Sequence, residues 1–103
     1  MPPINVYTII LPSQDAQRRY AAHTSYGLLG QGSTPYEARR SAMSGVAAHL
    51  RAYARQSQPL PQPNEDLEAL TEKYGALLTP TGKETREGKD GLPRLVFHFY
   101  RLV

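Results

Sequence analysis

The sequence contains no cysteine, and this absence excludes several kinds of site at once. A chain without cysteine has no disulfide framework, no thiolate zinc site, no iron–sulfur cluster and no cysteine nucleophile. Long apolar runs are also missing. The best candidate, residues 95–103, is interrupted by His98 and Arg101, whereas a membrane span needs ~18 apolar residues. The start, Met1 to Ile4, lacks the basic segment and the apolar stretch of a signal peptide, so we expect a cytoplasmic, soluble protein with no membrane partner.

The composition that remains is typical of one small folded domain. Hydrophobic residues make up 40% of the 103 residues and charged residues 20%, which argues against a disordered chain. This length allows one modest core, so we predict a single domain over residues 1–103. The net charge is +3, but residues 1–57 hold six arginines against Asp15 and Glu37. Such a basic half either contacts nucleic acid or an acidic protein, or is a solvated helix face.

Three short strands are expected near the N-terminus. Residues 4–11 are rich in β-branched side chains and end at a proline, and residues 19–26 provide a hairpin partner. Residues 28–32 fit a third strand. Within it, Gly30 and Gly32 indicate a bulge or a close approach of two backbones.

A helix from Pro35 to about Gln56 has the clearest local signal. Thr34 is a suitable N-cap, proline follows at the first helical position, and Glu37 completes a capping box. At about 100° per residue, the stripe of the helix that faces the sheet is expected to contain small and aromatic residues. Close packing between the helix and the sheet is expected at Gly45. That stripe holds Ala38, Ala42, Gly45, Val46, His49 and Tyr53, and the opposite side holds Arg40, Ser44, Arg51 and Arg55.

The rest of the chain predicts a strap, a second helix, a loop and a last strand. Residues 59–63 alternate with proline and should be extended. Asn64 is expected to cap a helix that stops at Gly75. Residues 79–91 are polar and read as a mobile loop, and residues 94–103 read as a strand. We therefore expect an α+β fold: a three-stranded antiparallel meander plus a C-terminal strand, with one long helix packed on the sheet.

No catalytic or metal site assembles from the sequence. His23, His49 and His98 are far apart and lack metal-ligand spacing. The Gly-x-Ser-x-Gly nucleophile motif and the phosphate loop are both absent. We therefore expect a protein that is not an enzyme and needs no cofactor or metal.

The last strand predicts self-association. Its side chains are apolar on both faces, and an exposed strand of this kind would aggregate. Because a chain this small has little surface with which to cover both faces, we expect a homo-oligomer, most simply a two-fold dimer. The expected interface consists of Leu95, Val96, Phe97, Phe99 and Tyr100.

Two segments of the chain together form a specific pattern. Residues 27–38 read Gly-Leu-Leu-Gly-Gln-Gly-Ser-Thr-Pro-Tyr-Glu-Ala, and residues 58–63 read Gln-Pro-Leu-Pro-Gln-Pro. These segments resemble the signature Pro-Gly-Cys-x-x-Gln-Gly-Asp-Thr-x-x-Glu-Ala and the Glu-Pro-Ile-Pro-Glu-Pro strap of the HicB family of antitoxins. Tyr26, Leu28 and Ser33 depart from the usual Pro, Cys and Asp. The resemblance covers residues 4–63, and its motif positions are Gly27, Gly32, Thr34, Glu37, Ala38, Pro59 and Pro61.

The resemblance implies the partial RNase H-like fold of the HicB N-terminal domain. It does not imply RNase activity, because the sequence lacks the acidic metal cluster that this chemistry requires. It implies an antitoxin that covers the RNA-binding and catalytic surface of a small HicA-type mRNA-cleaving toxin. Residues 64–103 read as a helix, a loop and a closing strand, so we expect no DNA-binding domain in them. Two alternatives stay open: a basic nucleic-acid-binding module that uses Arg40, Arg51 and Arg55, and an orphan HicB-like domain without a toxin.

Overall fold

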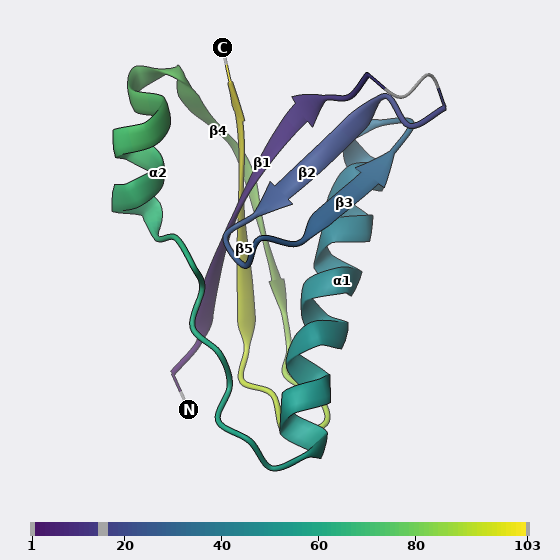
Figure 1. Cartoon of the computed structure of the whole chain (residues 1–103), viewed down its shortest axis with the longest axis vertical. Helices are drawn as coiled ribbons and strands as arrows, with labels where there is room; N and C mark the ends of the chain where they lie inside the picture. Colours follow the sequence, from purple (N-terminus) through teal and green to yellow (C-terminus); the bar gives the residue numbers. More distant parts are fainter. Residues whose placement is uncertain (1, 15–16, 103) are drawn as a thin grey trace.

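The computed structural model describes residues 2–14 and 17–102 and arranges the chain around a five-stranded mixed sheet (Figure 1). The strand order is β3-β2-β1-β5-β4, with β1 and β5 parallel and the other pairs antiparallel. The expected α+β class, the meander and the long helix on one face of the sheet are confirmed. The elements are β1 (Ile4–Pro12), β2 (Tyr20–Thr24), β3 (Leu29–Gly32), α1 (Pro35–Arg55), α2 (Leu67–Tyr74), a 3₁₀ turn (Gly75–Leu77), β4 (Leu78–Arg86) and β5 (Leu95–Leu102).

The expected mobile loop over residues 79–91 was wrong. Most of this segment is β4, which pairs with β5 along the open edge of the sheet. An edge strand has one neighbouring strand and does not need alternating apolar residues. A polar edge strand therefore lacks the sequence pattern by which strands are predicted. Pro80 is accommodated because the pairing shifts between Pro80 and Gly82, an irregularity that edge strands tolerate.

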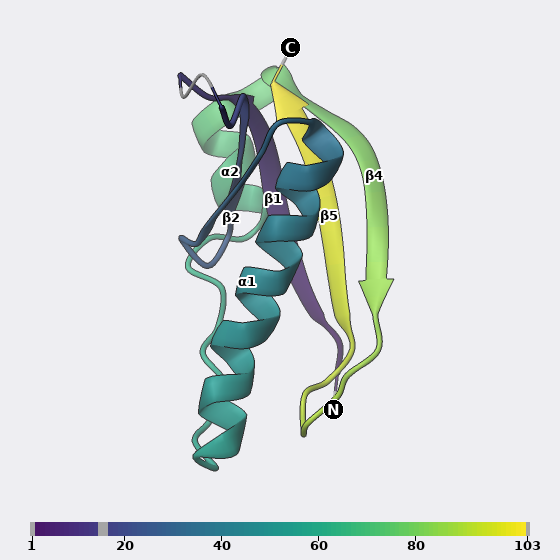
Figure 2. The ribbon, with the colours of Figure 1, turned by 90° about the vertical axis from the view of Figure 1, so that its right-hand side faces the viewer.

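The core lies between the sheet and α1. Figure 2 shows α1 running along one side of the sheet. The buried stripe of α1 is rotated from the expected one toward Met43, Ala47 and Leu50. Gly45 is exposed, and a Cβ added there would meet no neighbour within 4 Å, so the expected close packing there was wrong. The main cluster consists of Val6, Tyr26, Met43, Val46, Ala47, Leu50, Leu95, Phe97 and Phe99.

The close approach expected at Gly30 and Gly32 is confirmed. A Cβ on Gly30 would lie 2.7 Å from the Ala38 carbonyl oxygen and would overlap the backbone of Ala42. A Cβ on Gly32 would lie 2.6 Å from the backbone nitrogen of Ala38. These two glycines let β3 lie directly against the first turns of α1.

The N-cap predicted from the sequence is confirmed for α1 and is wrong for α2. The Thr34 hydroxyl accepts from the Glu37 backbone N–H at 3.1 Å, as expected of an N-cap. The Glu37 carboxylate accepts from the hydroxyl and the N–H of Ser33, and these hydrogen bonds lower its pKa. Asp66 caps α2, whereas the Asn64 backbone N–H donates to the Ser25 carbonyl, so the expected Asn64 cap was wrong. Gly75 ends α2 with φ of 60°, as expected.

The residues expected at an oligomer interface divide between the two faces of β5. Leu95, Phe97 and Phe99 point toward α1 and are at most 2% exposed within the single chain. These three residues therefore belong to the core, and their assignment to an interface is corrected. Val96 and Tyr100 are half-buried on the other face. Val103 lies outside the described residues.

Candidate functional site

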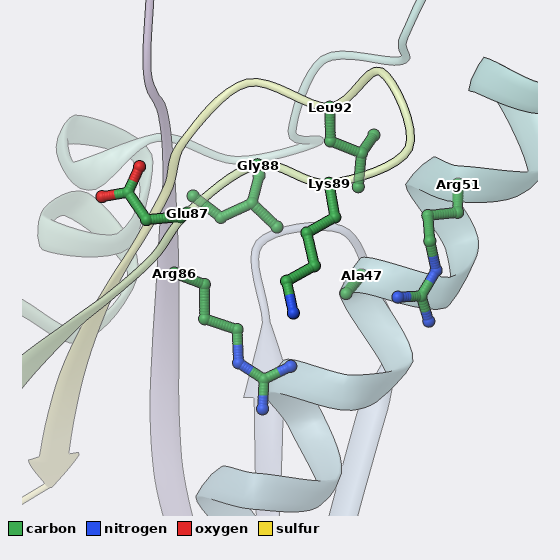
Figure 3. Close-up of a pocket in the computed structure, with 8 residues that line it drawn as sticks. Ala47, Arg51, Arg86, Glu87, Gly88, Lys89 and Leu92 are labelled. Atoms are coloured by element: carbon green, nitrogen blue, oxygen red, sulfur yellow. The ribbon is translucent and has the colours of Figure 1, made fainter.

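A groove with three cationic side chains separates the C-terminal half of α1 from the β4–β5 connection (Figure 3). Its volume is about 420 Å³. We call it the basic groove. Its lining residues are Ala47 and Arg51 of α1, Arg86 of β4, Glu87, Gly88, Lys89 and Leu92 of the connection, and Leu95 of β5.

The charged side chains of the basic groove are arranged asymmetrically. Figure 3 shows Arg51, Arg86 and Lys89 directed into the groove, with Glu87 directed away. The Glu87 carboxylate pairs with Arg94 at 3.2 Å. Within residues 2–14 and 17–102, the three groove cations form no ion pair with a carboxylate. The groove therefore carries an uncompensated positive charge.

The connection that carries Lys89 is a tight turn. Asp90 and Gly91 have φ of 57° and 83°, and the Leu92 N–H donates to the Lys89 carbonyl at 3.1 Å. Two positive φ values at the central positions are typical of a type I′ hairpin turn. A Cβ on Gly88 would overlap the Leu92 carbonyl. The backbone position of Lys89 is therefore set by close packing within the turn.

The floor of the groove is apolar. Ala47 is 5% exposed and Leu95 is 2% exposed, and Leu92 packs against the same core cluster. Arg51 and Arg86 are half-buried beside this floor. Partly buried charges are screened less than fully solvated ones, so an anion in this groove would be attracted more strongly than at an open surface.

The structure separates the three arginines that the sequence placed together. Arg51 lines the basic groove. Arg40 lies opposite Glu84 of β4 at 4.0 Å, and Arg55 is exposed and outside the groove lining. Arg86 and Lys89 were missed because their segment reads as a loop. The Asp90-Gly91 pair is the signal that could have placed a hairpin there.

Arg39 was also missed, and its role is in packing. Its guanidinium lies 4.6 Å from the centre of the Phe99 ring and donates to the Thr81 hydroxyl at 2.9 Å. The side chain therefore reaches from α1 across β5 to β4. Arg39 is a charged residue, but its side chain covers the buried Phe99 ring.

The histidines lie in separate places. His23 is exposed on β2, and His49 lies edge-on to Tyr26 and Tyr53. His98 stacks on Tyr7 with ring centres 4.9 Å apart and contacts Asn5 Oδ1 at 3.0 Å. Burial and the charge of Lys83 lower the pKa of His98. In the part of the chain that the structure describes, no three His, Cys, Asp or Glu side chains form a group that could hold a metal.

The strap over residues 59–63 packs on the turn after β2. The Tyr26 hydroxyl donates to the Pro61 carbonyl at 3.1 Å, and burial raises the pKa of this hydroxyl. The backbone N–H of Asn64 donates to the Ser25 carbonyl at 2.7 Å. Gly27 adopts φ of 76°, and a Cβ there would lie 3.3 Å from the Asn64 side chain. The turn in which the first HicB-like segment begins therefore contacts the strap at Pro61 and the residue that follows the strap.

The other motif positions have structural roles or are exposed. Thr34 and Glu37 cap α1, Ala38 is fully buried, and Gly32 allows the close packing of β3 on α1. Pro59 is exposed.

Comparison of the chain with protein-family models, with curated proteins and with solved structures finds no match. Among the described residues, no helix combines the length and the apolar character needed to cross a membrane.

Proposed function

We propose that this chain is a non-enzymatic binding protein of the HicB-like antitoxin type. It neutralises a small HicA-type mRNA-cleaving toxin by direct protein–protein contact, and it acts as a homo-oligomer. The observation that carries the proposal is the contact between the Gly27 turn and the proline strap. These segments are more than 20 residues apart in the sequence, and each alone is a weak motif.

The geometry of this contact supports the proposal in two ways. The Pro61 carbonyl of the strap accepts from the Tyr26 hydroxyl, and the N–H of Asn64, directly after the strap, donates to the Ser25 carbonyl, so the extended proline sequence has a defined partner. Gly27 needs its positive φ at the point of contact, which explains why glycine stands there. A strap held beside the turn in which the first motif segment begins is a more specific feature than either segment alone.

The test is recovery of the partner followed by a toxicity assay. The full chain, carrying an affinity tag, is expressed in the cells from which it comes, and co-purified proteins are identified by mass spectrometry. We expect a small basic protein that arrests growth and cleaves mRNA when expressed alone in a second host. Co-expression with the full chain is expected to restore growth.

A matched glycine variant shows whether a loss of rescue is specific to this turn. Gly27→Val strains the turn that contacts the strap and should weaken rescue, whereas Gly45→Ala on the exposed side of α1 should not. The proposal is overturned if no small partner is recovered, or if the recovered partner neither arrests growth nor cleaves mRNA.

A further inference from the structure

We propose that the basic groove binds the phosphate group of a nucleotide, either free or within a nucleic-acid strand. The inference rests on the groove alone and does not depend on a toxin partner. The observation behind it is the convergence of Arg51, Arg86 and Lys89 above an apolar floor, with the neighbouring carboxylate of Glu87 directed away (Figure 3).

The charge balance favours an anion of more than one negative charge. Three cations that share one groove repel one another, and the half-burial of Arg51 and Arg86 limits the screening of this repulsion. A single carboxylate would compensate one of the three. A phosphate monoester carries about −1.5 to −2 at pH 7 and offers three acceptor oxygens. Each phosphodiester of a strand carries one negative charge, so a strand would match the groove by placing two neighbouring phosphates in it. Phosphate is therefore the better match.

The donor geometry also fits phosphate. Two guanidinium groups offer planar pairs of N–H donors that match phosphate oxygens, and an ammonium adds a point charge. The three donors come from three separate elements, the helix α1, the strand β4 and the turn after it. Donors on opposite sides of a groove can surround one ligand, which donors along one helix face cannot do.

The backbone positions of the three donor residues are set before any ligand binds. Arg86 is in register with the buried Leu95 of β5. Lys89 belongs to the tight turn whose packing leaves no room for a side chain at Gly88. Arg51 follows the buried Leu50 on α1. Because these backbones are already ordered, the conformational entropy lost on binding is that of the three side chains and not that of the loop.

The size of the groove suits a nucleotide. A volume of about 420 Å³ lies in the range of small-molecule sites. The apolar floor of Ala47, Leu92 and Leu95 can contact the non-polar faces of a sugar or base. The lining contains no aromatic side chain on which a base could stack. We therefore expect affinity to come from the phosphate and to vary little with the base.

The test measures binding of defined probes to the full chain. Inorganic phosphate, ATP and a short fluorescent single-stranded RNA are each titrated into the wild-type protein at low salt. We expect binding of at least one phosphate probe, weakened as salt rises. In the methyl NMR spectrum, the signals of Ala47 and Leu92 are expected to shift during the titration because both side chains line the groove.

Three charge-neutralising variants locate the site. Arg86→Gln and Lys89→Gln are each expected to weaken binding about tenfold, the typical effect of losing a hydrogen bond to a charged group. Arg55→Gln is the matched control, because Arg55 is an exposed cation on the same helix outside the groove. It should bind as the wild type does. If Arg86→Gln fails to fold, Lys89→Gln in the exposed turn still decides the result.

The probes also distinguish the two sources of phosphate. ATP binding as tight as RNA binding assigns the groove to a free nucleotide, whereas RNA binding without ATP binding assigns it to a strand. The proposal is overturned if no phosphate probe binds at millimolar concentration. It is also overturned if Arg55→Gln weakens binding as much as the groove variants, or if a polyglutamate peptide competes as well as phosphate does.

Discussion

At the scale of single residues, two glycines of this chain have opposite roles. Gly30 lies where β3 meets α1, and a side chain there would overlap the backbone of the helix. Gly45 lies in the middle of α1 with open space around it. The same change at these two positions should therefore have opposite effects.

We predict that Gly30→Ala lowers the free energy of unfolding by roughly 1–3 kcal/mol or more, because the added methyl group forces β3 away from α1. We predict that Gly45→Ala raises it by about 1 kcal/mol, because alanine is the better helix former and meets no neighbour. Urea denaturation of the two variants and the wild type measures both values. A stabilised Gly30→Ala would contradict the close packing of β3 on α1.

His98 gives the chain a pH-dependent term in its stability. Burial and Lys83 hold its pKa in the folded state below the ordinary value of 6.5. As the pH falls below 6.5, the unfolded state therefore binds more protons at this residue than the folded state does. Protonation of His98 therefore has no effect on the free energy of unfolding well above pH 6.5 and lowers it as the pH falls below 6.5.

We predict that the melting temperature falls less between pH 7.5 and pH 5 in His98→Gln than in the wild type. Glutamine can still contact Asn5 but takes up no proton in this range. His23→Gln, an exposed change on β2, is the control and should keep the wild-type dependence. Identical pH profiles for His98→Gln and the wild type would show that this residue does not couple to folding.

At the scale of elements, β4 is the largest departure from the expected fold. Thr81, Lys83 and Thr85 of this strand are exposed, and its pairing with β5 is carried by backbone groups. In an antiparallel pair, alternate N–H groups of an edge strand donate to the neighbouring strand. The other N–H groups point outward.

We predict that alternate amides of residues 82–86 exchange with solvent at least about tenfold more slowly than the amides of residues 87–90, since only the paired N–H groups are protected. Hydrogen exchange followed by NMR measures each amide separately. Uniformly fast exchange over residues 79–91 would support a mobile loop and exclude β4.

The helices were more predictable than this strand because their signals are local. Thr34, Pro35 and Glu37 mark the start of α1 within four positions, and Gly75 marks the end of α2. The pairing of β4 depends on a tertiary contact with β5, and the residues of β4 alone do not predict that contact. The Asp90-Gly91 turn was the one short-range sign of this hairpin.

The candidate site was predictable only in part for the same reason. Arg51 could be selected from its place on the helix, since the periodicity of α1 is visible in the sequence. Arg86 and Lys89 line the groove only because the β4–β5 hairpin brings them opposite Arg51. Without β4, the sequence groups Arg51 with Arg40 and Arg55, which lie on the same helix but do not line the groove.

At the scale of the whole molecule, the two faces of the sheet are covered unequally. One face packs against α1 and forms the core. On the other face, Leu70 of α2 and Ile9 of β1 are both buried and line one cleft. Farther along this face, Tyr7 stacks on His98 and lies near Tyr100, and all three rings are half-buried. We call these three residues the outer aromatic cluster.

The outer aromatic cluster is the part of β1 and β5 through which we expect the chain to self-associate. Val96 and the three half-buried rings lie side by side on this face, and apolar groups gathered on a surface mark interaction sites. A dimer across this face would need to bury about 800 Å² per partner for ordinary stability. Leu95, Phe97 and Phe99 lie on the opposite, buried face of β5 and would not take part in the contact.

We predict that the wild-type protein is a dimer at micromolar concentration and that Tyr100→Glu is a folded monomer, because a charge on the outer face opposes burial between two copies. Phe97→Glu, which places a charge in the core, should instead unfold the chain. Ala52→Glu on the exposed side of α1 is the control and should remain a dimer. Light scattering gives the mass and circular dichroism the folded state. A monomeric wild type would exclude self-association, and a dimeric, folded Tyr100→Glu would place the contact away from the outer aromatic cluster.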